Sequence, residues 1–101
     1  MVLTGEVVEN GCFVMAGRRG EAHAACATAC ARAGQPLGIV DDKTGTLYLV
    51  LLDRTEHRPE DPLLEMISDR VEIRGIAIER GGVSAIVLKR VRSLSAPHES
   101  K

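Results

Sequence analysis

Apolar and polar residues alternate near the start of the chain, in the pattern of a strand with one buried face. Within residues 2–9, Leu3 and Val7 fall on one side, whereas Thr4 and Glu6 fall on the other. Alternation with a period of two is typical of a β-strand that faces a core on one side and solvent on the other. We therefore expect a strand over residues 2–9.

A second alternating segment, residues 70–80, changes its phase in the middle. Val71 and Ile73 share one face, whereas Ile76 lies on the opposite face, and the change falls at Gly75. A glycine inside a strand commonly marks a bulge or a sharp bend. The sequence thus predicts one long strand with a bulge or a sharp bend at this glycine.

Three further strands are expected next to turn signals. Residues 37–40 and 46–52 flank a polar turn and are expected to pair as a hairpin. Residues 83–91 follow the tight turn made by Gly81 and Gly82. Because the segment 46–52 is almost continuously apolar, we expect its strand to be covered on both faces or strongly twisted.

Two helices are expected between these strands. Residues 21–33 are rich in Ala, the best helix former, and Gly34 and Pro36 follow as stop signals. A shorter helix is expected over residues 61–68, with Asp61 as its N-cap and a proline at its first helical position. One helix is thus expected after the first strand and another after the third.

The segment between the first strand and the long helix carries mixed signals. Asn10 and Gly11 form a turn signal, residues 12–15 are a short apolar piece, and residues 16–20 read as a glycine-bounded basic loop. No helix is predicted in this segment.

The order of these elements resembles the oligonucleotide/oligosaccharide-binding (OB) barrel. That fold is a five-stranded barrel with a helix between its third and fourth strands. We expect a mainly β protein with an OB-like barrel, a long Ala- and Cys-rich helix inserted between strands one and two, and a short helix between strands three and four. A β-sandwich is less favoured because five strands are few for two sheets.

Residues 1–92 are expected to form a single domain, followed by a flexible tail over residues 93–101.

Composition and charge remove several classes of partner. The 101 residues include 13 Lys and Arg against 14 Asp and Glu, which gives a net charge of −1, and aromatic residues make up 2%. Proteins that track phosphates need a basic surface, and single-strand binders need aromatic rings for stacking, so no nucleic-acid partner is expected. The length of the longest apolar run, residues 47–52, is far below the roughly 18 residues that a membrane-spanning helix needs. The chain as given has no signal-peptide segment.

The candidate chemistry lies in a cluster of Cys12, His23, Cys26 and Cys30, spaced C-x10-H-x2-C-x3-C. On one α-helix the last three would share a stripe, because they are three and four positions apart. The histidine and the last cysteine would still be about 10 Å apart along the axis, so joint binding would need a favourable rotamer or a distorted first turn. Three thiolates and an imidazole form a donor set for zinc or cuprous copper.

Other interpretations fit the same residues. Cysteine is among the most buried residue types, so the helix could be an ordinary packed core helix. A disulfide between Cys12 and one helix cysteine would leave one buried thiol. Arg18 and Arg19, together with His23, would lower the pKa of a reactive thiol in a redox enzyme. A [2Fe–2S] cluster is less favoured than one ion, because the usual cluster spacings are absent.

The segment from Gly11 to Gly38 is similar to a family of small uncharacterised bacterial domains. The shared features are a cysteine after the first strand, a Gly-rich loop, the sequence His-x-x-Cys-Ala-x-x-Cys from His23 to Cys30, and a following Gly-x-Pro. The resemblance extends to the closing strand pair around Gly81, so that it covers most of the chain. It implies an exported protein, periplasmic or otherwise extracytoplasmic, with an accessory role in metal or redox chemistry and no defined activity.

The sequence supports two function hypotheses. The first is a small metal-binding domain, with Cys12, His23, Cys26 and Cys30 as ligands of zinc or copper and with no catalytic residues, in a structural or a metal/redox accessory role. The second is a metal-free protein-interaction domain stabilised by a disulfide or by buried thiols. Nothing resembles a hydrolase or nucleotide site, and the lone histidines outside the cluster are expected to be solvated. Apolar positions on the last two strands are compatible with a protein partner or a homodimer.

Overall fold

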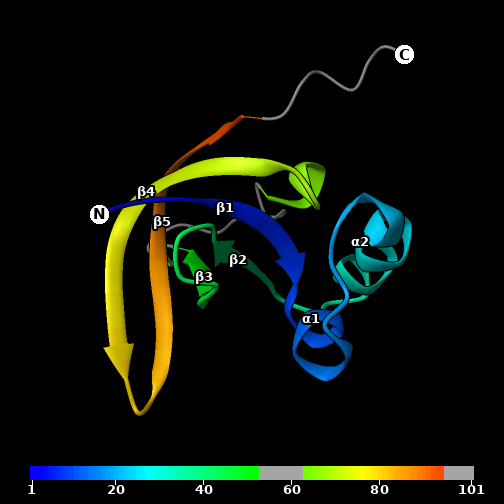
Figure 1. Cartoon of the computed structure of the whole chain (residues 1–101), viewed down its shortest axis with the longest axis horizontal. Helices are drawn as coiled ribbons and strands as arrows, with labels where there is room; N and C mark the ends of the chain where they lie inside the picture. The colour runs from blue at the N-terminus through cyan, green and yellow to red at the C-terminus, as the bar shows by residue number, and fades with distance from the viewer. Residues whose placement is uncertain (53–62, 95–101) are drawn as a thin grey trace.

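Five strands close into a barrel in the order β1-β2-β3-β5-β4 (Figure 1). The computed structural model describes residues 1–52 and 63–94. Strand β1 pairs with both β2 and β4, and β3 runs parallel to β5 to complete the closure. The predicted OB-like barrel is confirmed. Its strands are β1 (Val2–Glu9), β2 (Leu37–Asp41), β3 (Leu47–Leu52), β4 (Arg70–Arg80) and β5 (Val83–Ser93).

The barrel interior is filled by aliphatic side chains from alternating positions of the strands. Leu3 and Val7 of β1 point inward, as the alternation predicts, and are 3% and 0% exposed. Burial of such side chains stabilises each by about 1.5–3 kcal/mol relative to exposure, so this core is the main source of stability. The largest fully buried side chains are Ile39, Leu63, Ile73, Ile86, Val7, Val40 and Val71.

The predicted change of phase in the fourth strand is confirmed. The pairing of β4 with β5 shifts register between Arg74 and Gly75. Before the shift Ile73 is fully buried, and after it Ile76 is 55% exposed. A side chain at Gly75 would not fit, because a Cβ there would lie 2.0 Å from the carbonyl oxygen of Val87. Because Arg74 pairs with Arg90 and Gly75 pairs with Leu88, the extra residue of the bulge lies in β5, and Ile76 faces outward on the same side of β4 as Arg74.

Of the two alternatives expected for the third strand, coverage on both faces is wrong. All six residues of β3 keep some exposure, and Leu51 is 44% exposed. Tyr48, Val50 and Leu52 pack on the core, so the strand has one inner face and one outer face. The outer face continues across the neighbouring strand β5 onto the exposed half of β4, because Leu51 pairs with Val87 and Val87 pairs with Ile76.

The turn predicted at Asn10 and Gly11 is replaced by a helix. Helix α1 (Asn10–Ala16) begins directly after β1, and Glu9 is its N-cap. The Glu9 carboxylate accepts hydrogen bonds from the backbone N–H groups of Gly11, at 2.5 Å, and Cys12, at 3.0 Å. A side-chain acceptor of this kind satisfies N–H groups that the first turn of a helix leaves unpaired.

The predicted long helix is confirmed in extent but divided. It starts as a 3₁₀ turn, η1 (Glu21–His23), and continues as helix α2 (Ala24–Arg32). The division falls at His23, which has φ −110° and ψ 9°. The helix thus has a tighter first turn than a continuous α-helix would have.

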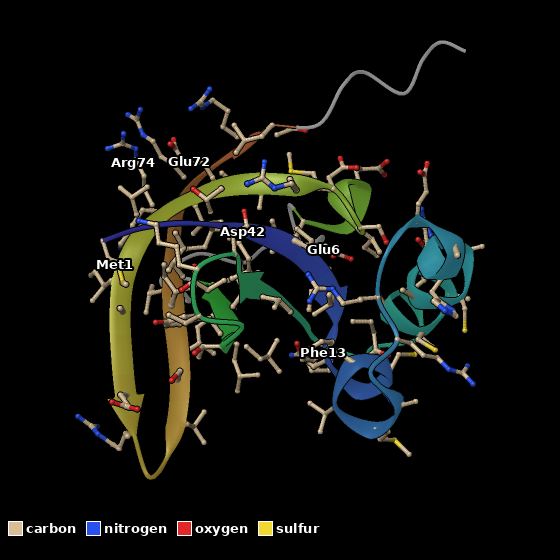
Figure 2. All side chains as sticks on the ribbon, in the orientation of Figure 1. Met1, Glu6, Phe13, Asp42, Glu72 and Arg74 are labelled. Carbon is tan, nitrogen blue, oxygen red and sulfur yellow. The ribbon has the colours of Figure 1, made fainter. Side chains whose placement is uncertain are left out.

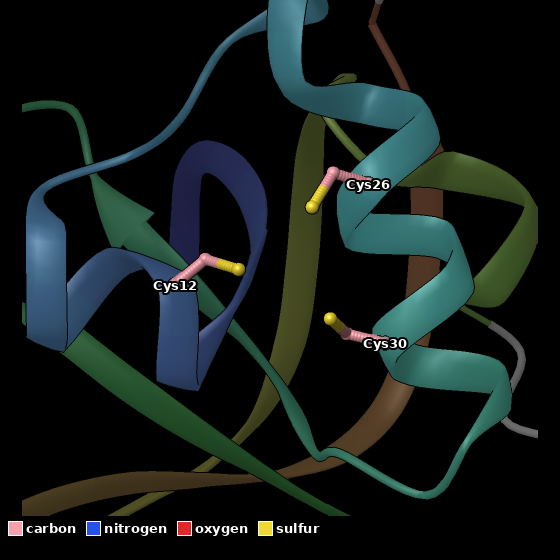
Figure 3. Close-up of side chains that lie close together, drawn as sticks. All are labelled: Cys12, Cys26 and Cys30. Carbon is pink, nitrogen blue, oxygen red and sulfur yellow. The ribbon is translucent and has the colours of Figure 1, made fainter.

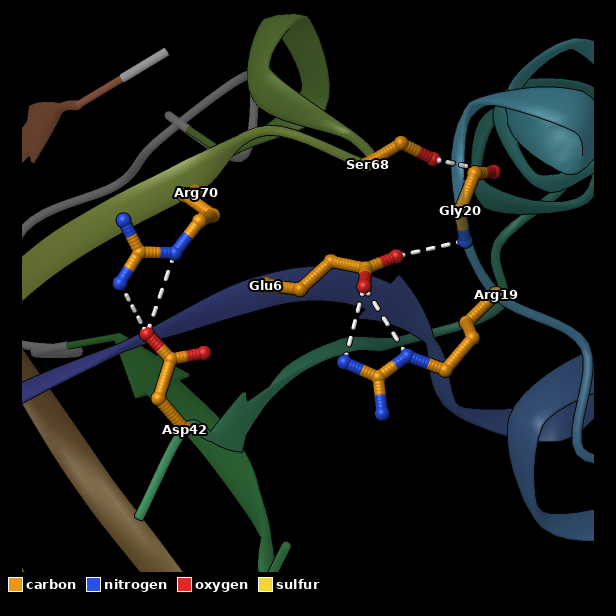
Figure 4. A network of polar contacts seen from close by, with 6 residues as sticks. All are labelled: Glu6, Arg19, Gly20, Asp42, Ser68 and Arg70. Atoms are coloured by element: carbon orange, nitrogen blue, oxygen red, sulfur yellow. Dashed lines mark hydrogen bonds and ion pairs between the residues drawn. The ribbon is translucent and has the colours of Figure 1, made fainter.

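A polar network fastens the loop before η1 to the barrel (Figure 4). Glu6 of β1 accepts hydrogen bonds from Arg19 Nε, at 2.9 Å, and from the backbone N–H of Gly20, at 2.6 Å. Ser68, two residues before β4, donates a hydrogen bond from its Oγ to the Gly20 carbonyl at 3.0 Å. The loop that leads into α2 is therefore held by contacts to β1 and to Ser68, which precedes β4 and is distant in sequence.

The connection between β3 and β4 contains one 3₁₀ turn, η2 (Leu64–Met66). This turn lies within the predicted short helix, whose expected start at Asp61 falls outside the described residues, as does the expected tail beyond residue 94. None of the helices in residues 1–52 and 63–94 has the length and hydropathy that a membrane crossing requires.

Candidate metal centre

Three cysteines from two helices meet beside the barrel. Cys12 comes from the first turn of α1, and Cys26 and Cys30 come from α2. Their sulfur atoms all lie within 4.8 Å of one another. Figure 3 shows the three thiols pointing into the space between the two helices. The structure thus brings together three of the four residues that the sequence suggested as ligands.

Local structure explains why the sulfurs converge. Cys26 and Cys30 are four positions apart on α2, so they project from the same face one turn apart. Cys12 faces them because Glu9 ends β1 and starts α1, which turns the chain toward α2. In addition, Gln35 donates its backbone N–H to the Cys30 carbonyl at 3.1 Å, which closes the end of α2 beneath the cluster.

The geometry of the cluster suits a single thiophilic ion. Three sulfurs bound tetrahedrally to zinc at about 2.3 Å are separated from one another by about 3.8 Å, which falls within the observed limit. All three cysteines are free, and none is joined in a disulfide. Cys26 is exposed and the other two are half-buried, so an ion can reach the sulfurs from solvent. The three sulfurs are thus close enough together to hold one metal ion.

His23 does not belong to the group of ligand atoms that lie within 4.8 Å of one another. It is half-buried and ends the η1 turn, directly before α2. In a 3₁₀ turn there are 3.0 residues per turn instead of 3.6, so side chains leave the stripe that a continuous α-helix would give. Its role as the fourth ligand stays a prediction.

Glu9 is the residue at this site that the sequence did not reveal. Its side chain is 2% exposed, and its carboxylate accepts a hydrogen bond from the Cys12 thiol. Burial acts to raise the pKa of this carboxyl. The hydrogen bonds from the Cys12 thiol and from the N–H groups of Gly11 and Cys12 outweigh burial and lower the pKa below its usual value. In the sequence Glu9 only continues the strand, so no local signal marked it.

The same contact makes Cys12 a weak acid. The hydrogen bond to Glu9, followed by burial and by the negative charges of Glu9, Cys30 and Cys26, raises the pKa of the Cys12 thiol to about 12. The expectation that Arg18 and Arg19 lower a thiol pKa is therefore not met at Cys12. Arg19 instead pairs with Glu6 and lies 5.9 Å from the centroid of the Phe13 ring. Near neutral pH Cys12 is therefore mainly a neutral thiol in the metal-free protein.

We expect Glu9→Gln to make Cys12 more reactive in the reduced, metal-free protein. In the unchanged protein at pH 8, iodoacetamide should modify Cys12 at least about tenfold more slowly than Cys26, because so little of its thiol is ionised. Gln keeps an oxygen that accepts the backbone hydrogen bonds but lacks the charge. The rates are measured by mass spectrometry of the labelled peptides.

Glu6→Gln is the matched control, since Glu6 lies on the same strand but contacts Arg19 and Gly20. It should leave the Cys12 rate unchanged. An unchanged Cys12 rate in Glu9→Gln would show that the carboxylate does not govern this thiol.

Comparisons with known proteins found no relative of this chain. No protein-family model, curated protein or solved structure matches the chain.

Proposed function

We propose that this protein is a small metal-binding domain in which Cys12, Cys26 and Cys30 bind one thiophilic ion, zinc or cuprous copper. The observation that carries the proposal is the convergence of three free sulfurs within 4.8 Å from two separate helices. Packing alone gives no reason for three thiols to face one another at a partly exposed position. Thiolate donors select soft or borderline ions and disfavour magnesium and calcium.

The number of donors defines two binding modes. Zinc takes four ligands in structural sites, so it would need His23, after a change of rotamer, or a water molecule as the fourth. Cuprous copper is satisfied by soft thiolates alone. Copper(I) would therefore bind to the three sulfurs alone, whereas zinc would take a fourth ligand on the solvent-exposed side of the cluster.

The position of the cluster supports a structural or accessory role for the ion. An ion held by all three sulfurs would join α1 to α2, the two α-helices of the connection between β1 and β2. Metal binding displaces the thiol protons and adds its free energy to folding, because the site does not exist in the unfolded chain. Because Cys26 is exposed, the same ion would also be open to exchange with a partner that carries thiols of its own.

Metal titration of the reduced protein tests this function. We expect one equivalent of Co²⁺ to produce thiolate-to-cobalt charge-transfer absorption, and one equivalent of Zn²⁺ to displace it. Copper(I) affinity is measured against a chromogenic copper(I) chelator. A count of reactive thiols should fall from three to none when the ion is bound. His23→Ala should weaken zinc retention and leave copper(I) binding unchanged if the imidazole supplies the fourth zinc ligand.

The contrary result is equally definite. If the reduced protein takes up no thiophilic ion and all three thiols stay reactive in its presence, then it is not a metal-binding domain.

A second candidate function is favoured by the outward apolar side chains of the β3, β4 and β5 surface. Leu51, Ile76, Ile78 and Val83 are between 38% and 55% exposed. Exposed apolar patches mark surfaces that bind other proteins. A metal-free interaction domain would therefore show binding through this surface, or a homodimer in sedimentation, together with no metal uptake.

A further inference from the structure

Three arginines gather on the outer face of the β4–β5 ladder, apart from the cysteine cluster. In the register of the two strands Glu72 lies opposite Arg92, and Arg74 lies opposite Arg90. Glu72 and Arg74 face outward, because Val71 and Ile73, which alternate with them along β4, are fully buried. Arg90 and Arg92 of β5 are exposed. Figure 2 shows Glu72 and Arg74 on the outside of the barrel, far from the two helices that hold the cysteines.

The charges of this face are not balanced. Glu72 Oε1 lies 3.3 Å from Arg92 Nη2 and 3.8 Å from Arg74 Nε, so this one carboxylate forms ion pairs with two guanidinium groups. Among the described residues Arg90 has no ion-pair partner. Two like charges directly opposite on paired strands destabilise the ladder. Three guanidinium groups against one carboxylate leave a surplus of two positive charges.

These side chains form a groove of a size suited to a small ligand. The groove has a volume of about 640 Å³ and is lined by Glu72, Arg74, Arg90, Val91 and Arg92. Neighbouring outward positions on one strand are about 7 Å apart, and opposite positions are about 5 Å apart. The three guanidinium groups can therefore converge on one tetrahedral anion.

We propose that this groove binds the phosphate group of a small phosphate monoester. Such a group carries close to two negative charges at neutral pH, which matches the surplus of the groove. Guanidinium forks donate paired hydrogen bonds to phosphate oxygens, and no carboxylate within residues 1–52 and 63–94 pairs with Arg90. The neutralised charge would also relieve the repulsion between Arg74 and Arg90.

The lining disfavours a nucleic-acid strand as the occupant. None of the residues that line the groove is aromatic, so bases would find no surface on which to stack. The basic residues that line the groove span only two rungs of the ladder, whereas a polymer needs a longer track of cations. Recognition is thus centred on one phosphate group.

Arginine side-chain NMR tests the proposal with glycerol 1-phosphate as the probe. Addition of the probe to the ¹⁵N-labelled protein should shift the Nε–H signals of Arg74, Arg90 and Arg92. We expect Arg90→Gln to weaken binding at least about tenfold. Arg80→Gln, at the tip of the same hairpin, is the matched control and should bind as the unchanged protein does. Glu72→Gln should tighten binding, because it removes the competing carboxylate.

Several outcomes would overturn the proposal. It is wrong if Arg90→Gln and Arg80→Gln bind the probe equally, or if the signals of these arginines do not respond. It is also wrong if single-stranded DNA or vesicles of phosphatidylglycerol shift the same signals while glycerol 1-phosphate does not. Because the groove contains no cysteine, none of these results bears on the metal centre.

Discussion

Cys12→Ser is expected to lower the affinity for Co²⁺ and Zn²⁺ at least about a hundredfold. Of the three proposed ligands only Cys12 comes from α1, so its loss leaves two sulfurs on a single helix, one turn apart. Two thiolates from one face of a helix cannot surround an ion. Even loss of a group that only orients a ligand commonly weakens metal binding 10- to 100-fold, and loss of a ligand costs more. The affinity is measured by competition with a chromogenic chelator.

Met15→Ser is the matched control for this change. It also replaces a sulfur-containing residue of α1 with serine, but Met15 is 87% exposed and lies outside the cluster. The control should bind metal as the unchanged protein does. Equal affinity in Cys12→Ser and in the control would mean that the two helices are not joined through an ion, and would contradict the proposed centre.

Gly5→Ala is expected to destabilise the barrel by about 3 kcal/mol or more. A Cβ at this position would lie 2.0 Å from the carbonyl oxygen of Val40 and 2.8 Å from its carbonyl carbon. The obstacle is backbone, so it cannot move aside as a side-chain end would. Gly5 pairs with Asp41 of β2 and with Val71 of β4, so any shift of β1 disturbs two ladders. Overpacking of this kind is among the few causes of very large losses of stability.

Urea unfolding followed by far-UV circular dichroism measures the effect. Gly45→Ala is the control, because Gly45 has φ +75° but nothing within 4 Å of the added Cβ. It should cost about 1 kcal/mol from backbone conformation alone. A loss in Gly5→Ala no larger than in Gly45→Ala would show that β1 and β2 separate at little cost.

The strands could be predicted because their signal is local. Burial on one face of a sheet imposes a period of two, and that period is visible in residues 2–9 and 70–80 without knowledge of the partner strands. The change of phase at Gly75 is visible for the same reason, since it moves the apolar side chains from one face to the other. The order of elements was then enough to indicate an OB-like barrel.

Part of the candidate metal site was equally local. The spacing of Cys26 and Cys30 places both on one face of any α-helix. The approach of Cys12 was only a hypothesis in the sequence, because it depends on helix α1. That helix was missed since its N-cap is Glu9, whereas Ser, Thr, Asp and Asn are the usual signals.

What the sequence by itself determined is the set of strands, the bend at Gly75, and the two sulfurs that share a helical face. Each follows from a short-range periodicity that the backbone imposes on neighbouring residues. Only the tertiary structure decided that Cys12 faces those sulfurs, that His23 stands apart, and that Arg74 lies opposite Arg90. The first depends on the helix that Glu9 caps and on how it packs beside α2, the second on a 3₁₀ turn, and the third on the register of two paired strands. None of these leaves a periodic pattern of apolar residues in the sequence.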